Sequence, residues 1–83
     1  RYVHEETVRL SAHDRGLRFG DGIFETCIVA QGQVFDAPAH EARLARGLKT
    51  YGLPVIPDSL GRIGAALAAR NGVACGLFRL IVT

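Results

Sequence analysis

Arg43 is the residue of this 83-residue chain whose surroundings best suit binding chemistry. A guanidinium is a rigid, planar group of N–H donors that can bind a phosphate or a carboxylate through two hydrogen bonds. In a helix, the residues four positions before and after it would be Ala39 and Gly47, which are small enough to let the side chain reach a cleft. Spacing alone favours another interpretation, a surface arginine paired with Glu41 or Asp36.

Arg79 raises a similar question, because it is a charged residue within the apolar run LFRLIVT at positions 77–83. In a strand, it would share a face with Leu77 and Ile81. A charge on such a face needs a partner or contact with water. Exposure at a sheet edge is the alternative.

A Gly-Asp-Gly turn at positions 20–22 leads into a segment with the alternating pattern of a strand, 23–30. The alternation places Ile23, Glu25, Cys27 and Val29 on one face, and Phe24, Thr26, Ile28 and Ala30 on the other. The simplest interpretation of the glycines is a turn that needs positive φ, and the alternative is close approach of a neighbour or ligand. No Gly-Lys-Ser/Thr follows and no helix follows, which argues against a phosphate-binding loop or a dinucleotide fingerprint.

The elements expected around these residues alternate between strands and helices. Gln31-Gly32 is a two-residue hairpin turn, and Gly52 and Gly72 follow the two helices. The predicted elements are an extended segment at 2–10, a loop at 13–22, strands at 23–30, 33–35 and 77–83, and helices at 38–51 (buried through Leu44, Leu48 and Tyr51) and 58–71 (buried through Leu60, Ile63 and Leu67). The fold class is therefore α+β, with an antiparallel sheet that carries two helices on one face.

Composition excludes several classes of function. The net charge of +2 is small and the arginines are scattered, so we expect no nucleic-acid partner. No apolar run approaches the roughly 18–20 residues of a membrane span. Cys27 and Cys75 stand alone and the histidines form no ligand set, so we expect no metal. Since the chain stops inside an apolar strand, we expect residues 1–83 to be one small domain of a longer protein.

Three motifs, in order, resemble one family: Asp14-Arg15-Gly16, then Phe19-Gly20-Asp21-Gly22-x-Phe24-Glu25, then His40-x-x-Arg43-Leu44 after the hairpin. They are similar to the N-terminal small domain of the fold-type IV, or class IV, pyridoxal-phosphate enzymes. That family includes branched-chain aminotransferases, D-amino-acid aminotransferases and 4-amino-4-deoxychorismate lyases. The resemblance extends from about residue 10 to residue 83, nearly the whole chain.

The resemblance implies a role for particular residues. Arg43 would hold the phosphate of pyridoxal 5′-phosphate. Phe24 and Thr26 would line the substrate side of the active site, and Arg79 would lie near the substrate carboxylate. The lysine that forms the Schiff base belongs to the larger domain and would lie beyond Thr83. These 83 residues alone would then hold no catalytic residue and be inactive.

The resemblance leaves the reaction open. Transamination of an amino acid with a keto acid is the first interpretation. Elimination of pyruvate by a 4-amino-4-deoxychorismate lyase, in folate synthesis, is the second. A non-catalytic α+β module for binding or dimerisation is a third. For either enzyme, family membership implies a cytoplasmic homodimer that acts on small molecules, without a membrane or nucleic-acid partner.

Overall fold

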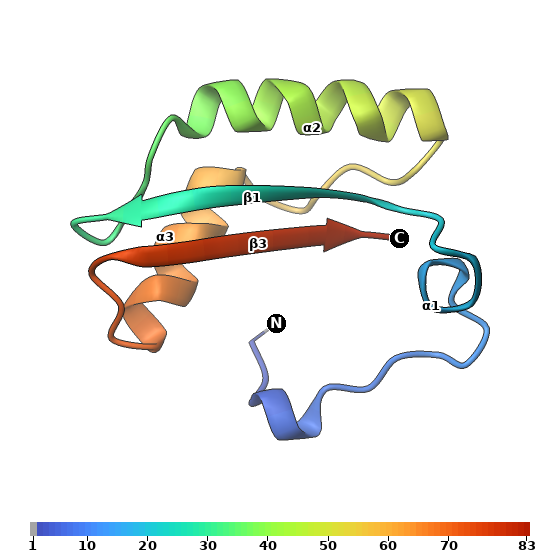
Figure 1. Cartoon of the computed structure of the whole chain (residues 1–83), viewed down its shortest axis with the longest axis horizontal. Coiled ribbons are helices and arrows are strands. Elements are labelled where there is room, and N and C mark those ends of the chain that lie inside the picture. Colours follow the sequence, from blue (N-terminus) through green and yellow to red (C-terminus); the bar gives the residue numbers. More distant parts are fainter. Residues whose placement is uncertain (1) are drawn as a thin grey trace.

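The computed structural model describes residues 2–83 and shows a small antiparallel sheet with its long helices on one side (Figure 1). In these residues the sheet has three strands, in the order β2-β1-β3. The elements are a short 3-10 helix (Glu5–Thr7), α1 (Arg15–Phe19), β1 (Ile23–Ala30), β2 (Gln33–Val34), α2 (Ala37–Tyr51), α3 (Leu60–Arg70) and β3 (Gly76–Val82). The predicted α+β fold class is confirmed.

The central strand β1 is paired along nearly its whole length with β3, from Ile23 opposite Val82 to Val29 opposite Gly76. On its other side it pairs with β2 only near its end. The predicted hairpin turn is present. Gln31 and Gly32 both have positive φ, 52° and 72°, as expected for a tight turn whose twist matches the strands. Within residues 2–83, most of β1 therefore has no strand along the edge on the side of β2.

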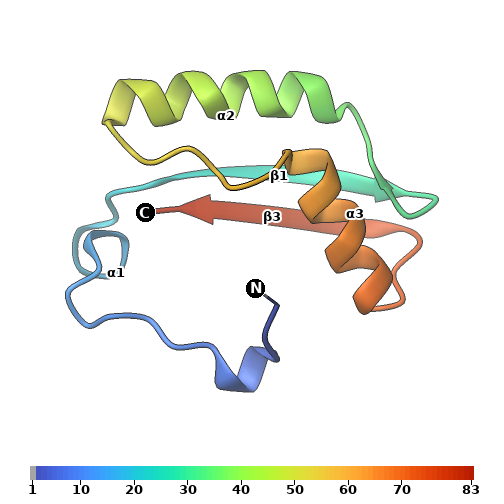
Figure 2. The ribbon, with the colours of Figure 1, turned by 180° about the vertical axis from the view of Figure 1, so that it is seen from behind.

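The buried core lies between the sheet and the two long helices. Figure 2 shows the ribbons of α2, α3 and the sheet from behind. Its buried members are Cys27, Val29, Val34, Leu44, Leu48, Leu60, Ala68 and Phe78. They come from all three strands and from both α2 and α3, so both helices cover one face of the sheet, as the sequence predicts. The opposite face, which we call the open face, exposes Phe24, Ile28, Leu77 and Ile81.

The apolar stripes of the helices differ in part from the prediction. Tyr51 is 70% exposed and Leu67 is 38% exposed, so neither belongs to the core. In α3, Leu60 is buried as predicted and Ile63 is partly buried against the core, while Gly64 and Ala68 are buried rather than Leu67. A Cβ atom on Gly64 would overlap Val34 and lie 2.9 Å from Cδ1 of Phe78. The small residues of α3 therefore face the sheet, because the helix axis lies too close to the strands for larger side chains.

The N-terminal residues also differ from the prediction. The segment 2–10 forms no strand and is exposed. The predicted loop contains α1, which Asp14 caps by accepting a hydrogen bond from the backbone N–H of Leu17. Gly20, with φ of 71°, ends this helix.

A Cβ on Gly22 would lie 2.7 Å from the carbonyl oxygen of Val82, so this glycine permits close approach to the end of β3. Among the described residues, no helix is long and apolar enough to cross a bilayer.

Candidate functional site

The candidate site is built around a buried carboxylate, that of Glu25 in β1. The alternation of the strand turns this side chain toward the helices, together with Cys27 and Val29, and leaves it only 4% exposed. An ionised carboxylate at such a position is costly unless charged or polar groups bind it. The groups that bind it come from α2.

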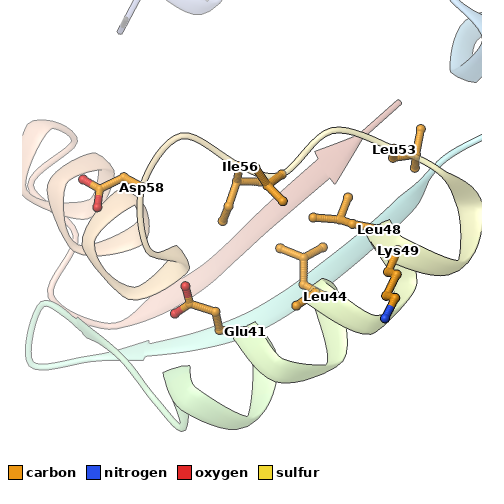
Figure 3. Close-up of a pocket in the computed structure, with 9 residues that line it drawn as sticks. Glu41, Leu44, Leu48, Lys49, Leu53, Ile56 and Asp58 are labelled. Atoms are coloured by element: carbon orange, nitrogen blue, oxygen red, sulfur yellow. The ribbon is translucent and has the colours of Figure 1, made fainter.

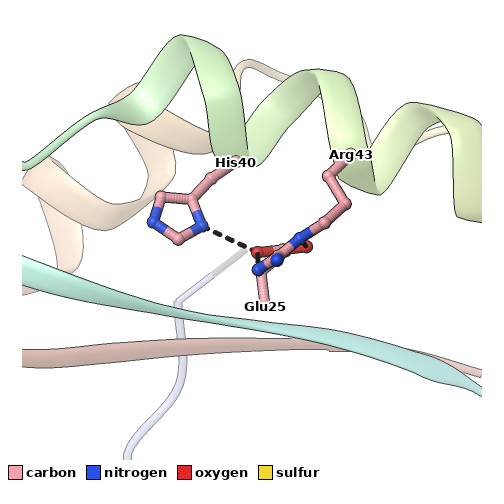
Figure 4. Close-up of polar contacts among 3 residues, drawn as sticks. All are labelled: Glu25, His40 and Arg43. Atoms are coloured by element: carbon pink, nitrogen blue, oxygen red, sulfur yellow. Dashed lines mark hydrogen bonds and ion pairs between the residues drawn. The ribbon is translucent and has the colours of Figure 1, made fainter.

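Arg43 and His40 both contact Glu25 (Figure 4). Nε and Nη2 of Arg43 donate to Oε1 and Oε2 of Glu25, each at 2.7 Å. Nδ1 of His40 lies 2.7 Å from Oε2. His40 and Arg43 are three positions apart, which puts them on the same side of α2. The result is a three-residue network, Glu25–His40–Arg43, that joins α2 to the middle of the sheet.

The network keeps Glu25 ionised. Hydrogen bonds from Arg43 lower the pKa of Glu25 from its ordinary value of 4.5 to about 2, against the opposing effect of burial, and His40 adds to the lowering. The same contact raises the pKa of Arg43 above its ordinary value. An ionised carboxylate can only accept hydrogen bonds, so Nδ1 of His40 must carry the proton that it shares with Glu25.

Arg43 remains accessible while it is held in this way. Its side chain is 65% exposed. Glu25 takes the N–H of Nε and one of those on Nη2, which leaves the donors of Nη1 and the second donor of Nη2 for another partner. Arg43 lines a pocket of about 250 Å³ together with Asp36, Ala39, His40 and Arg46. The predicted pairing of Arg43 with Glu41 or Asp36 is not what the structure shows.

The two small neighbours of Arg43 serve different purposes. Ala39 lines the pocket beside Arg43, as its size suggests. A Cβ on Gly47 would instead lie 2.8 Å from Cδ1 of Ile23 in β1. Gly47 therefore lets α2 approach the sheet, and it is this approach that brings Arg43 within reach of Glu25.

The other three predicted site residues lie together on the open face. Thr26 and Arg79 are directly opposite each other in the β1–β3 pair. The guanidinium carbon of Arg79 lies 4.4 Å from the centre of the Phe24 ring. Cys27 points to the opposite face and is buried. Arg43 contacts the helix-facing side of β1, so it is separated from these three residues by the strand itself.

A larger pocket of about 630 Å³ lies between α2 and the segment that follows it (Figure 3). Its walls are mainly apolar and include Leu44, Leu48, Leu53, Val55 and Ile56, with Glu41, Lys49 and Asp58 as its charged members. None of the four predicted site residues lines it. Within residues 2–83 there is also no cluster of three or more side chains suited to a metal ion.

Sequence reasoning missed Glu25 and His40 as members of the site. A signal for Glu25 was available, since it shares the buried face of β1 with Cys27 and Val29 and a charge there needs a partner. The partner could not be found from spacing, because Glu25 and Arg43 are 18 positions apart.

Comparisons with known proteins show the family to which the chain belongs. Residues 22–83 match the family described as Amino-transferase class IV, and the chain belongs to this family. It is 31% identical over 80 residues to a D-alanine aminotransferase of Staphylococcus epidermidis, a match that covers 93% of this chain and 28% of the relative. It is 29% identical over 84 residues to the D-alanine aminotransferase of Staphylococcus aureus, which covers 99% of this chain and 30% of that relative.

Among solved structures, the chain is similar to the 4-amino-4-deoxychorismate lyase of Pseudomonas aeruginosa. The TM-score is 0.70 and the sequence identity 37%, and the match covers 92% of this chain and 27% of the lyase. The predicted resemblance to class IV enzymes and to the N-terminal part of their fold is confirmed. The chain spans less than a third of the length of each of these relatives.

Proposed function

We propose that this chain is the N-terminal part of a pyridoxal-phosphate enzyme that transfers an amino group between an amino acid and a keto acid. The observation that carries the proposal is Arg43, an arginine that Glu25 holds through two hydrogen bonds, that has donors left over, and that also lines an open pocket. Membership of the class IV aminotransferase family supports the same conclusion. So do relatives whose names are D-alanine aminotransferase.

The pocket fits the phosphate group of the cofactor. A phosphate monoester carries close to two negative charges at neutral pH and binds well to a planar guanidinium. Arg43 would supply the donors that Glu25 leaves free, and Arg46 adds a second positive charge to the pocket lining. Asp36 is the one carboxylate among the lining residues, and Glu25, which does not line the pocket, offsets Arg43. A phosphate there would therefore be held by directed hydrogen bonds more than by an excess of positive charge.

The open face would bind the substrate. Phe24 offers an apolar ring, Thr26 a hydroxyl and Arg79 a guanidinium suited to a carboxylate. Pyridoxal phosphate, when bound, supplies an electron sink for a negative charge formed at the α-carbon of an amino acid. β2 pairs with β1 only at Val29 and Ala30, so the edge of β1 nearer to Glu25 is not covered by β2. We propose that the cofactor lies along this edge, with its phosphate at Arg43.

The lysine required for covalent binding of the cofactor is proposed to lie outside these 83 residues. Lys49 is the only lysine in the sequence. It lines the apolar pocket on α2 rather than the pocket beside Arg43. We therefore propose that the whole protein contains a second, larger domain, and that it works as a homodimer in the cytoplasm on small-molecule substrates.

Elimination of pyruvate from 4-amino-4-deoxychorismate is the second candidate, favoured by the likeness to the Pseudomonas lyase. The intact protein should be assayed with both substrates and added pyridoxal phosphate. Amino transfer from D- or L-amino acids to a keto acid, without pyruvate release from aminodeoxychorismate, supports the first proposal. Pyruvate release alone supports the second. Neither reaction, together with no binding of the cofactor, would favour a non-catalytic binding or dimerisation module.

A further inference from the structure

We propose that Glu25 is a positioning residue for the cofactor phosphate, because it sets the orientation in which Arg43 presents its donors. This inference rests on the proposed function, since it assumes that Arg43 binds the phosphate. It assigns a role to a buried carboxylate that does not itself face the pocket. His40 takes part by holding the same carboxylate.

The geometry of the contact fixes the plane of the guanidinium. Two parallel hydrogen bonds of 2.7 Å join Arg43 to both oxygens of Glu25. The carboxylate belongs to the central strand of the sheet, which is more rigid than a surface loop. Without this contact, Arg43 would be a long and largely exposed side chain free to adopt many rotamers. Fixing it before the ligand arrives removes an entropy cost from binding.

His40 restrains the carboxylate in turn. Its Nδ1–H donates to Oε2, the oxygen that also accepts from Nη2 of Arg43. The Glu25 side chain thus has a partner on each side and cannot rotate away from Arg43 without losing both contacts. His40 also lines the pocket, so the network and the candidate anion site share two residues, His40 and Arg43.

The charge of the network makes the orientation of the free Arg43 donors important for binding an anion. Glu25 offsets most of the positive charge of Arg43, so the pair attracts an anion less strongly than a free arginine would. Recognition then depends on how well the free N–H donors are aimed. A purely structural network that holds α2 on the sheet is the competing explanation, and it predicts no special effect on the phosphate.

The test compares dissociation constants for pyridoxal 5′-phosphate and for pyridoxal, which lacks the phosphate, in the intact protein. Glu25→Gln keeps the size of the side chain but loses one acceptor oxygen, so the paired hydrogen bonds with Arg43 cannot both form. Removing the negative charge of Glu25 strengthens the attraction of Arg43 for an anion, and we expect the loss of orientation to outweigh this gain. The variant should then lose about tenfold in affinity for the phosphorylated form relative to pyridoxal, equivalent to about one charged hydrogen bond. Glu41→Gln, a matched change on α2, should leave the ratio of the two dissociation constants unchanged.

The double variant with Arg43→Ala separates the possible outcomes. If Glu25 acts through Arg43, adding Glu25→Gln to Arg43→Ala should change the preference for phosphate less than about twofold. Equal losses for both ligands in Glu25→Gln would overturn the inference and leave a structural role. An unchanged preference in Arg43→Ala would instead overturn the phosphate assignment in the proposed function. If Glu25→Gln does not fold, the same two dissociation constants are compared in Glu25→Asp, which keeps the charge but has a shorter side chain.

Discussion

The guanidinium of Arg79 stacks over the ring of Phe24, 4.4 Å from its centre, on the open face of the sheet. The two residues come from adjacent strands, and Thr26 lies directly opposite Arg79. A guanidinium held against a ring in this way keeps its edge free to bind a carboxylate. The contact therefore joins the apolar and charged parts of the proposed substrate surface.

Replacing Phe24 should alter substrate selection more than cofactor binding. In the intact enzyme, Phe24→Ala removes both the apolar wall and the support for Arg79. We expect kcat/KM for the preferred amino acid to fall about tenfold relative to a smaller one, with the dissociation constant of pyridoxal phosphate changing less than about threefold. Kinetics with two amino acids of different size, together with cofactor titration, test this. If the dissociation constant of the cofactor changes more than the substrate selectivity, Phe24 does not belong to the substrate surface.

Cys27 should matter for stability rather than for selectivity. It is 1% exposed on the helix-facing side of β1, and burial raises the pKa of its thiol. Cys27→Ser places a hydroxyl in this apolar site, and we expect a loss of about 1–3 kcal/mol in the free energy of unfolding. Cys75→Ser, at an exposed cysteine, is the matched control and should change it by less than about 0.5 kcal/mol. Altered substrate preference in Cys27→Ser would show that the faces of β1 are misassigned.

Arg43→Ala should weaken the binding of pyridoxal phosphate by about tenfold or more, because hydrogen bonds to charged groups contribute about 1.5–3 kcal/mol each. Arg43→Lys should recover only part of the loss, since it keeps the charge but not the paired geometry with Glu25 and the phosphate. Arg62→Ala is a suitable control, as Arg62 is an exposed arginine that pairs with Asp58. Absorbance titration with free cofactor measures all three. An unchanged dissociation constant in Arg43→Ala would refute the phosphate assignment.

The Glu25 carboxylate should make stability fall in acid. Its pKa is about 2 in the folded protein against an ordinary value of 4.5. A lowered pKa contributes stability that is fully present above about pH 4.5 and is lost as the pH falls toward 2. Because Arg43 is largely exposed and screened by water, we expect a loss on the order of 1–3 kcal/mol across this range.

Unfolding curves measured between pH 5 and pH 2 on the intact protein and on Glu25→Gln would test this. The variant should be less stable at pH 5, and the difference should shrink toward pH 2, where Glu25 begins to be protonated in the folded parent protein as well. A difference that stays constant over this range would mean that the network does not hold Glu25 ionised.

Gly64 should resist substitution although it lies within a helix. Alanine is favoured over glycine in helices by about 1 kcal/mol. Yet a Cβ at this position would overlap Val34 and press on Phe78, so Gly64→Ala should destabilise the protein by about 1–3 kcal/mol. Ala69→Gly, at an exposed site of the same helix, should cost only about 1 kcal/mol through helix propensity. Thermal or urea unfolding compares the two, and a stabilised Gly64→Ala would show that α3 is not packed tightly on the sheet.

The sequence by itself determined the elements whose signals are local. The alternation of β1 assigned Phe24 and Thr26 to one face and Cys27 to the other, as the structure has them. Gln31-Gly32 indicated the hairpin turn, and Gly52 indicated the end of α2, where it adopts the left-handed conformation. These features depend on residues within a few positions of one another, so backbone preferences and periodicity are enough to predict them.

Only the tertiary structure decided which residues meet. The partner of Arg43 proved to be Glu25, which lies 18 positions away, rather than its neighbours Glu41 or Asp36. Packing also decided that Gly64 is buried and that Tyr51 is exposed, against the simplest apolar stripe. The physical reason is that helix-to-sheet distance and orientation depend on the whole core, and Gly47 and Gly64 let α2 and α3 approach strands that no local pattern places beside them.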